Sequence, residues 1–305
     1  MKRTRLRDMN LIDDFLFMTL ISHEEYGPEA ARYMLSTILQ RPIGEVEVHA
    51  QKVFYGLNEE QHGIRMDAFI KEGDSPDASG SFYDLEPDKR KGSKEDLPLR
   101  TRYYHNIIDN RCLKTSEDYC NLRNAYVIMI TSYDPFERNR MRYTIKNRCI
   151  EEPDLNYEDG ALTIYLYVNG NPDGLPEDLI HLLRYMKSTT AGNAVGNLST
   201  IHNMVEKLKQ NKEVQQAEMN FHERMKYERE EARKEGREEG RKEGREEGRE
   251  EGRKEGRKEG QAEEHKNTLR EMQRADSAEQ RAASLEKENA LLKEQLAALK
   301  KLTPS

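Results

Sequence analysis

The chain has 305 residues, of which 35% are hydrophobic and 35% charged, and its formal net charge is −7 at pH 7. This length and composition allow one globular domain of roughly 200 residues and a further part that is not globular. The negative net charge excludes a diffuse basic coat, so any contact with DNA must come from a local patch.

Targeting and redox signals point to a cytoplasmic protein without membrane contact. The basic start MKRTRLRDMN is followed by LIDDFLFMTL, whose acids interrupt the apolar core that a signal peptide needs. No apolar run approaches the length of a transmembrane helix. The three cysteines, Cys112, Cys120 and Cys149, have no CxxC spacing, and we expect reduced, packed thiols.

The first 90 residues predict helices and then a β-hairpin. Apolar residues at three- and four-residue spacing indicate a helix pair over 13–39, with Asp13 as a candidate N-cap. A strand is expected over 46–55. Two β-prone runs, 64–71 and 81–88, are joined by a polar loop with turn chemistry, so they predict a hairpin.

Strands and helices alternate in the following 130 residues. We expect a helix over 98–109, a buried strand over 126–131, a strand over 162–168 and an amphipathic helix over 177–186. One long helix is expected from about 197 towards 227. This alternation predicts an α/β fold with a mixed sheet covered by helices.

Carboxylates gather on the predicted hairpin. Asp67 lies in the middle of the first strand, and strand alternation puts Asp84, Glu86 and Asp88 on one face of the second. Like charges held close together are costly unless something compensates them, and a divalent cation such as Mg²⁺ or Mn²⁺ is one compensation. The alternative is a set of ordinary solvent-facing acids.

The helix after the hairpin carries a basic and aromatic cluster that includes Arg100, Arg102 and Tyr104. Arginine binds phosphate through two hydrogen bonds and tyrosine stacks or donates, so this helix is a candidate DNA-binding surface. In the alternative interpretation, the aromatic side packs on the sheet and the arginines pair with acids such as Asp84 or Asp88.

Five segments of the chain resemble the Rpn/PD-(D/E)XK nuclease family transposases, the recombination-promoting nucleases of bacteria. They are RMDAF, FYDLEPDK, LPLRTRYYHNIID, YVIMITSYDPF and EDGALTIYLYVNG, and the resemblance covers roughly residues 10 to 220. It implies a restriction-endonuclease-like core over 1–226. Asp67 would be the first motif acid and Glu86 the acid of the E-x-K or E-x-Q element, and both would bind Mg²⁺ or Mn²⁺ in catalysis.

The chain departs from that family pattern at one position. Two residues after Glu86, where the element carries Lys or Gln, stands Asp88, followed by Lys89. Lys89 would then orient the attacking water, or Asp88 would be a third metal ligand. Three functions follow: a metal-dependent DNA endonuclease in recombination or mobile-element biology, a catalytically inactive DNA-binding relative, and an oligomerising scaffold.

Residues 227–262 form a low-complexity spacer of Arg, Lys, Glu and Gly, with a glycine at every fourth position from 236 to 260. Each glycine costs a helix about 1 kcal/mol, which neighbouring opposite charges offset only in part. The balanced charges exclude a basic arm for DNA. We expect a marginal helix that separates the core from the C-terminal segment.

The last segment, 263–305, predicts a coiled coil and a parallel homodimer. Its apolar residues follow a seven-residue repeat, and Asn289 at an a position favours two strands in register. The alternative is a charged helix that packs on its own core domain. The a positions are Ala275, Ala282, Asn289 and Leu296, and the d positions are Ala278, Leu285, Leu292 and Leu299.

Overall fold

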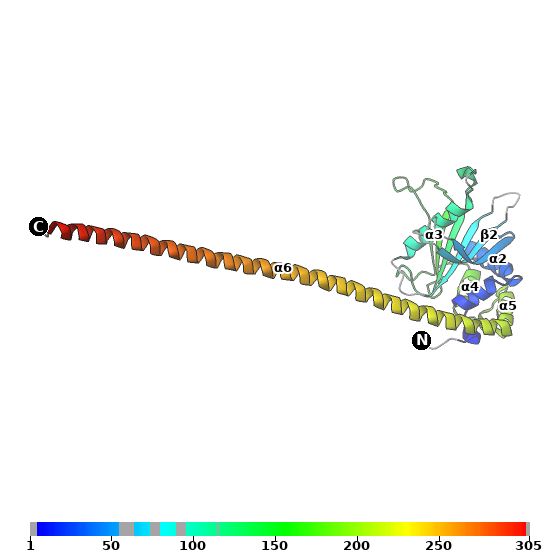
Figure 1. The fold of residues 1–305 in the computed structure, drawn as a ribbon. Coiled ribbons are helices and arrows are strands. Elements are labelled where there is room, and N and C mark those ends of the chain that lie inside the picture. Colours follow the sequence, from blue (N-terminus) through cyan, green and yellow to red (C-terminus); the bar gives the residue numbers. More distant parts are fainter. Residues whose placement is uncertain (1–4, 55–63, 74–79, 90–95, 115, 303–305) are drawn as a thin grey trace. The chain divides into compact units, whose positions relative to one another are not determined.

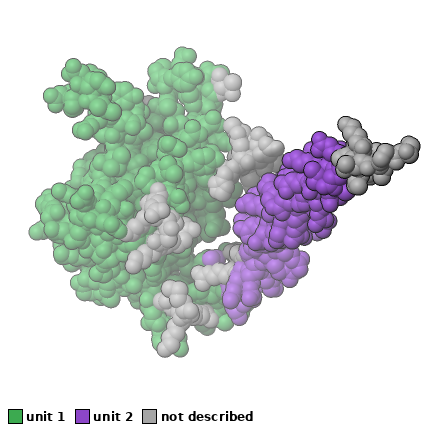
Figure 2. Space-filling model, turned by 90° about the vertical axis from the view of Figure 1, so that its left-hand side faces the viewer, with its two compact units in different colours: residues 1–224 green, residues 225–305 purple. Residues whose placement is uncertain are grey.

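A computed structural model describes residues 5–54, 64–73, 80–89, 96–114 and 116–302 (Figure 1). They belong to two compact units, residues 1–224 and residues 225–305 (Figure 2). The predicted strand end at Tyr55 lies outside the described residues. No helix in these ranges is long and apolar enough to cross a membrane.

The first unit contains one open sheet of six strands, which confirms the expected α/β class with a mixed sheet. The hairpin strands β2 and β3 are antiparallel, β3, β4 and β6 run parallel, and the edge strands β1 and β5 are antiparallel to their neighbours. In spatial order the strands are β1 (Val46–Phe54), β2 (Ile64–Glu72), β3 (Phe82–Asp88), β4 (Ala125–Thr131), β6 (Ala161–Tyr167) and β5 (Arg142–Ile145).

Helices cover both faces of this sheet (Figure 1). One face, which includes Leu85 and Ile128, packs with four helices into one hydrophobic cluster. The other face, which includes Val127 and Met129, packs against α3 (Leu97–Cys112). The four helices are α1 (Asp14–Ile21), α2 (Tyr26–Leu39), α4 (Glu177–Lys187) and α5 (Leu198–Gln210), and single 3-10 turns lie at Leu6–Asp8, Tyr119–Asn121 and Ala191–Asn193.

The edge strand β1 is interrupted at Gln51. This residue adopts a left-handed conformation with φ of 52°, which is uncommon for a residue other than glycine. Residues pair across β1 and β2 from Val46 to Ala50 and again from Lys52 to Phe54, but Gln51 and Asp67 are missing from the ladder. The kink in β1 therefore lies opposite Asp67.

The expectation of one helix from about 197 towards 227 is wrong. Helix α5 ends at Gln210, and α6 (Lys212–Leu302) begins after Asn211, whose φ of −70° and ψ of 126° are extended. The Asn211 side-chain oxygen accepts hydrogen bonds from the backbone N–H groups of Glu213, at 2.7 Å, and Val214, at 3.3 Å. Asn211 thus caps α6, because these N–H groups have no partner within the helix.

Replacing Asn211 with alanine should lower the free energy of unfolding by about 1 kcal/mol, the usual cost of losing an N-cap. Urea denaturation of the full chain would measure the change. Asn211→Asp is the matched control, because aspartate retains the capping oxygen and should stay within a few tenths of a kcal/mol of the native chain. Equal losses in both variants would contradict a capping role.

The spacer and the predicted coiled-coil segment are helical in the structure, both within α6. A Cβ added at any spacer glycine would meet no atom within 4 Å, so close packing does not account for these glycines. The three cysteines are free, as expected. Cys120, however, is exposed, so the expectation of a packed thiol is wrong for this residue.

Candidate functional site

The β2–β3 ladder stops where the candidate acids begin. Backbone pairing runs from Lys71 and Phe82 to Ala68 and Leu85 and goes no further. Pro87, one residue beyond Glu86, has no N–H with which to continue the ladder. The N–H of Asp67 instead donates to the carboxylate of Glu86, with 2.6 Å between N and Oε1.

Three acidic side chains of this region lie close together: Asp67, Asp84 and Glu86. Asp84 is fully buried and Glu86 is 4% exposed, while Asp67 is half-buried. Burial and repulsion from Asp67 raise the pKa of Glu86 to about 8. The hydrogen bond from the Asp67 N–H and the positive charge of Arg100 lower this pKa, but by less. Burial and the Glu86 charge raise the pKa of Asp84 well above its ordinary value.

Asp84 has the least compensated side chain of the site. With both carboxyls ionised, neither Asp84 oxygen has a hydrogen-bond partner among the described residues. A proton held between Asp84 and Glu86 would supply one, which is consistent with the raised pKa of both groups. Buried polar groups without partners are costly, so this position favours a proton or a bound cation.

Asp88 lies on the same strand but has its own cation. Its Oδ2 accepts a hydrogen bond from Arg100 Nη2 at 2.8 Å and one from the hydroxyl of Tyr133 at 3.3 Å. The pair is well buried, with side-chain exposures of 20% for Arg100 and 1% for Asp88. For Arg100 the structure therefore shows the pairing with Asp88 that the alternative interpretation named.

Helix α3 divides the predicted DNA-binding residues between two faces. Arg100 and Tyr104 share the face towards the sheet, with the guanidinium carbon 5.9 Å from the centre of the Tyr104 ring. Tyr104 is buried, and burial together with the Glu86 charge raises the pKa of its hydroxyl. Arg102 is exposed to solvent, so the structure does not bring it together with the other two.

Lys89 pairs with a residue other than Asp67, Asp84 and Glu86. Its ammonium group forms an ion pair with Asp13, the residue before α1. The other oxygen of Asp13 accepts the N–H of Asn10 at 2.7 Å, so Asp13 occupies the N-cap position without capping α1 through its side chain. The roles predicted for Lys89 and Asp88 in catalysis stay predictions, and the structure gives each residue a different partner.

The structure thus brings Asp67 and Glu86 together, as the predicted hairpin indicated. Asp84 lies with them, on the strand face where its two-residue spacing from Glu86 predicted it. Among the described residues, no three His, Cys, Asp or Glu side chains form a group arranged to hold a metal ion.

The chain was compared with protein-family models, with curated proteins and with solved structures, and none of them matches it.

Proposed function

We propose that residues 1–226 form a restriction-endonuclease-like domain that cuts DNA with the help of Mg²⁺ or Mn²⁺. One observation carries the proposal: Asp67, Asp84 and Glu86 gather where the β2–β3 ladder ends, and both oxygens of buried Asp84 lack a partner among the described residues. The nearby cation, Arg100, is hydrogen-bonded to Asp88. The resemblance to the recombination-promoting nucleases supports the same function.

The donor chemistry of the site fits a divalent cation, which Asp67 and Glu86 would hold. Carboxylate oxygens are the ligands that Mg²⁺ and Mn²⁺ prefer, and mutually repelling acids gain from a shared cation. When bound, the cation supplies polarisation of a phosphoryl oxygen and a more acidic water. The raised pKa of Glu86 and Asp84 lets this pair hold a proton near neutral pH when no cation is present.

In this proposal, Arg100 would contact the phosphate. One of its terminal nitrogens is engaged by Asp88, but the buried Nε–H group has no partner among the described residues. A phosphate oxygen is a strong acceptor for such a group, and the charge-assisted bond would place the scissile phosphate beside the acids. Asp88 would then act by orienting Arg100.

The test is nicking of supercoiled plasmid by the full chain, with and without Mg²⁺ or Mn²⁺. Asp67→Asn and Glu86→Gln should each lower the metal-dependent rate by about 100-fold or more, as the loss of a catalytic group does. Both should also weaken Mg²⁺ binding measured by calorimetry. Exposed Asp154→Asn is the control and should leave the rate and the binding unchanged.

The second candidate, a catalytically inactive DNA-binding relative, is favoured by the ion pair between Lys89 and Asp13. If this alternative is correct, the native chain will shift DNA in a gel and will not nick it with either metal. A chain that neither nicks nor shifts DNA would support the oligomerising scaffold instead. Unchanged nicking in both Asp67→Asn and Glu86→Gln would show that the active site lies elsewhere.

A further inference from the structure

The helical segment over 263–295 exposes an apolar face. Every side chain in this range is exposed within the chain. Leu285 and Leu292 are 58% and 50% exposed. They are seven residues apart and so lie near one side of the helix, where they share the d position of the heptad repeat. A water-exposed stripe of this kind is the usual contact surface of a coiled coil.

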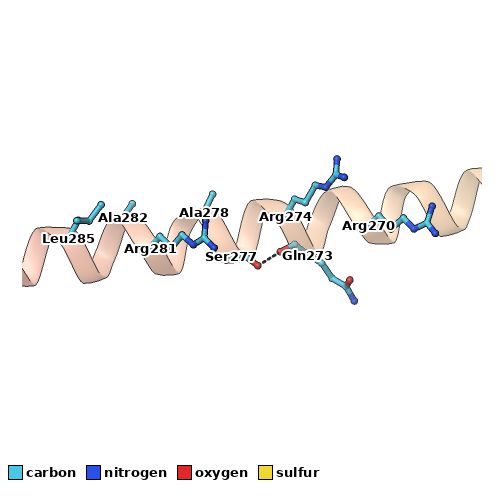
Figure 3. A pocket seen from close by; sticks show the side chains of 8 residues that line it. All are labelled: Arg270, Gln273, Arg274, Ser277, Ala278, Arg281, Ala282 and Leu285. Carbon is cyan, nitrogen blue, oxygen red and sulfur yellow. Dashed lines mark hydrogen bonds between the residues drawn. The ribbon is translucent and has the colours of Figure 1, made fainter.

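Small side chains lie among longer ones along this part of the helix (Figure 3). Ala278 and Ala282 lie between the longer side chains of Arg274, Arg281 and Leu285. Alanine at core positions lets a second helix approach closely, and the flanking arginines extend towards that partner.

The charges beside the seam identify the partner as a second copy of the same segment. In a parallel, in-register pair, each g residue lies by the e residue five positions later in the other chain. All three such pairs within the described side chains have opposite signs. They are Arg274 with Glu279, Arg281 with Glu286, and Glu288 with Lys293.

Asn289 favours the parallel orientation. In a parallel pair, an a position faces the a position of the partner, so Asn289 meets its own copy and the two amides can hydrogen-bond. In an antiparallel pair, a faces d, and Asn289 would lie against an apolar residue such as Leu285 or Leu292. A buried amide without a partner is costly, which disfavours that arrangement.

We propose that this face of α6, with Ala275, Ala278, Ala282, Leu285, Asn289 and Leu292 as its seam, binds a second copy of the chain in a parallel, in-register dimer. The side chains of Leu296 and Leu299, which would continue the seam, lie outside the described residues. This interaction is independent of the nuclease activity proposed above.

Two adjacent leucines provide a matched test. Leu291 and Leu292 are similarly exposed in the single chain, at 57% and 50%, but only Leu292 lies on the seam. Leu292→Asp puts two carboxylates at one d layer and should raise the dimer dissociation constant of the full chain about 100-fold or more. Leu291→Asp should leave it within a few-fold. Light scattering over a concentration series measures both.

The orientation is tested by exchanging charges at Arg281 and Glu286. These residues are five positions apart on one helix and do not face each other, and neither has a charged residue three or four positions away. Arg281→Glu alone should therefore weaken the dimer, by about 3-fold or more. Adding Glu286→Arg should restore it only through contacts between two parallel chains.

Three results would overturn the proposal. If the native chain is monomeric at all concentrations, this face does not bind a second copy and is available to a different protein. Equal association of Leu291→Asp and Leu292→Asp would place the interface elsewhere in the chain. Failure of Glu286→Arg to rescue Arg281→Glu would exclude the parallel register. Circular dichroism of each variant should match the native spectrum, because the substituted side chains are exposed in the single chain.

Discussion

Replacing Arg100 with methionine is expected to lower the free energy of unfolding by about 3–5 kcal/mol, the usual cost of leaving a buried charge without its partner. Asp88 would lose its 2.8 Å hydrogen bond to Nη2, the charged partner that compensates its buried carboxylate, while the longer hydrogen bond from the Tyr133 hydroxyl would remain. Methionine fills much of the volume of arginine, so the loss would report on charge more than on packing. Urea denaturation of the full chain at pH 7 measures it.

Arg102 is the matched control, because it lies two residues away on the same helix and is exposed. Arg102→Met should change the free energy of unfolding by less than about 0.5 kcal/mol. Adding Asp88→Asn to Arg100→Met should recover part of the loss, since the buried charge is then removed. Equal losses in Arg100→Met and Arg102→Met would contradict a stabilising role for the buried pair.

The stability of the metal-free chain should fall as the pH rises from 6.5 to 8. Glu86 has a pKa of about 8 in the folded chain and an ordinary value of 4.5, so between these values the folded state binds a proton that the unfolded state has released. A one-proton difference corresponds to about 1.4 kcal/mol per pH unit, tapering near the folded pKa. Asp84, with its raised pKa, acts in the same direction.

One histidine acts in the opposite direction at the lower end of this window. Burial lowers the pKa of His105, so His105 favours the folded state as the pH rises through 6.5, and this effect fades over about the next pH unit as the unfolded imidazole loses its proton. Glu86→Gln should make the free energy of unfolding less dependent on pH between 6.5 and 8 and should raise it at pH 8. Glu152→Gln, at an exposed position, should leave the free energy of unfolding and its pH dependence unchanged. A native chain equally stable at both ends of this window would show that the acids titrate normally.

Local patterns predicted most elements of the first unit because those elements follow strong signals. The apolar run of β4 and the turn between β2 and β3 each point to one structure. The edge strand β5 (Arg142–Ile145) was missed because it is short and lies among charged residues. The break at Asn211 was missed because no glycine or proline occurs between residues 197 and 227 to mark the end of a helix.

In the candidate site, the sequence predicted only the contacts that arise between strands adjacent in the chain. The predicted hairpin placed Glu86 near Asp67 because it makes their strands neighbours, and alternation put Asp84 on the same face as Glu86. The partner of Lys89 was not predictable, since Asp13 is 76 residues away and meets it only through the packing of α1 near the end of β3. The end of the β2–β3 ladder after Leu85 was readable in principle, because Pro87 lacks the N–H that continued pairing requires.

The kink at Gln51 has a consequence for solubility. An unpaired edge strand presents free N–H and C=O groups on which another chain can form intermolecular β-sheet and begin aggregation. β1 lies at the end of the strand order and is nine residues long. The left-handed residue divides it into two shorter stretches, neither of which offers a long straight template. The same backbone turn that lies opposite Asp67 thus also protects the folded chain from adding strands at this edge.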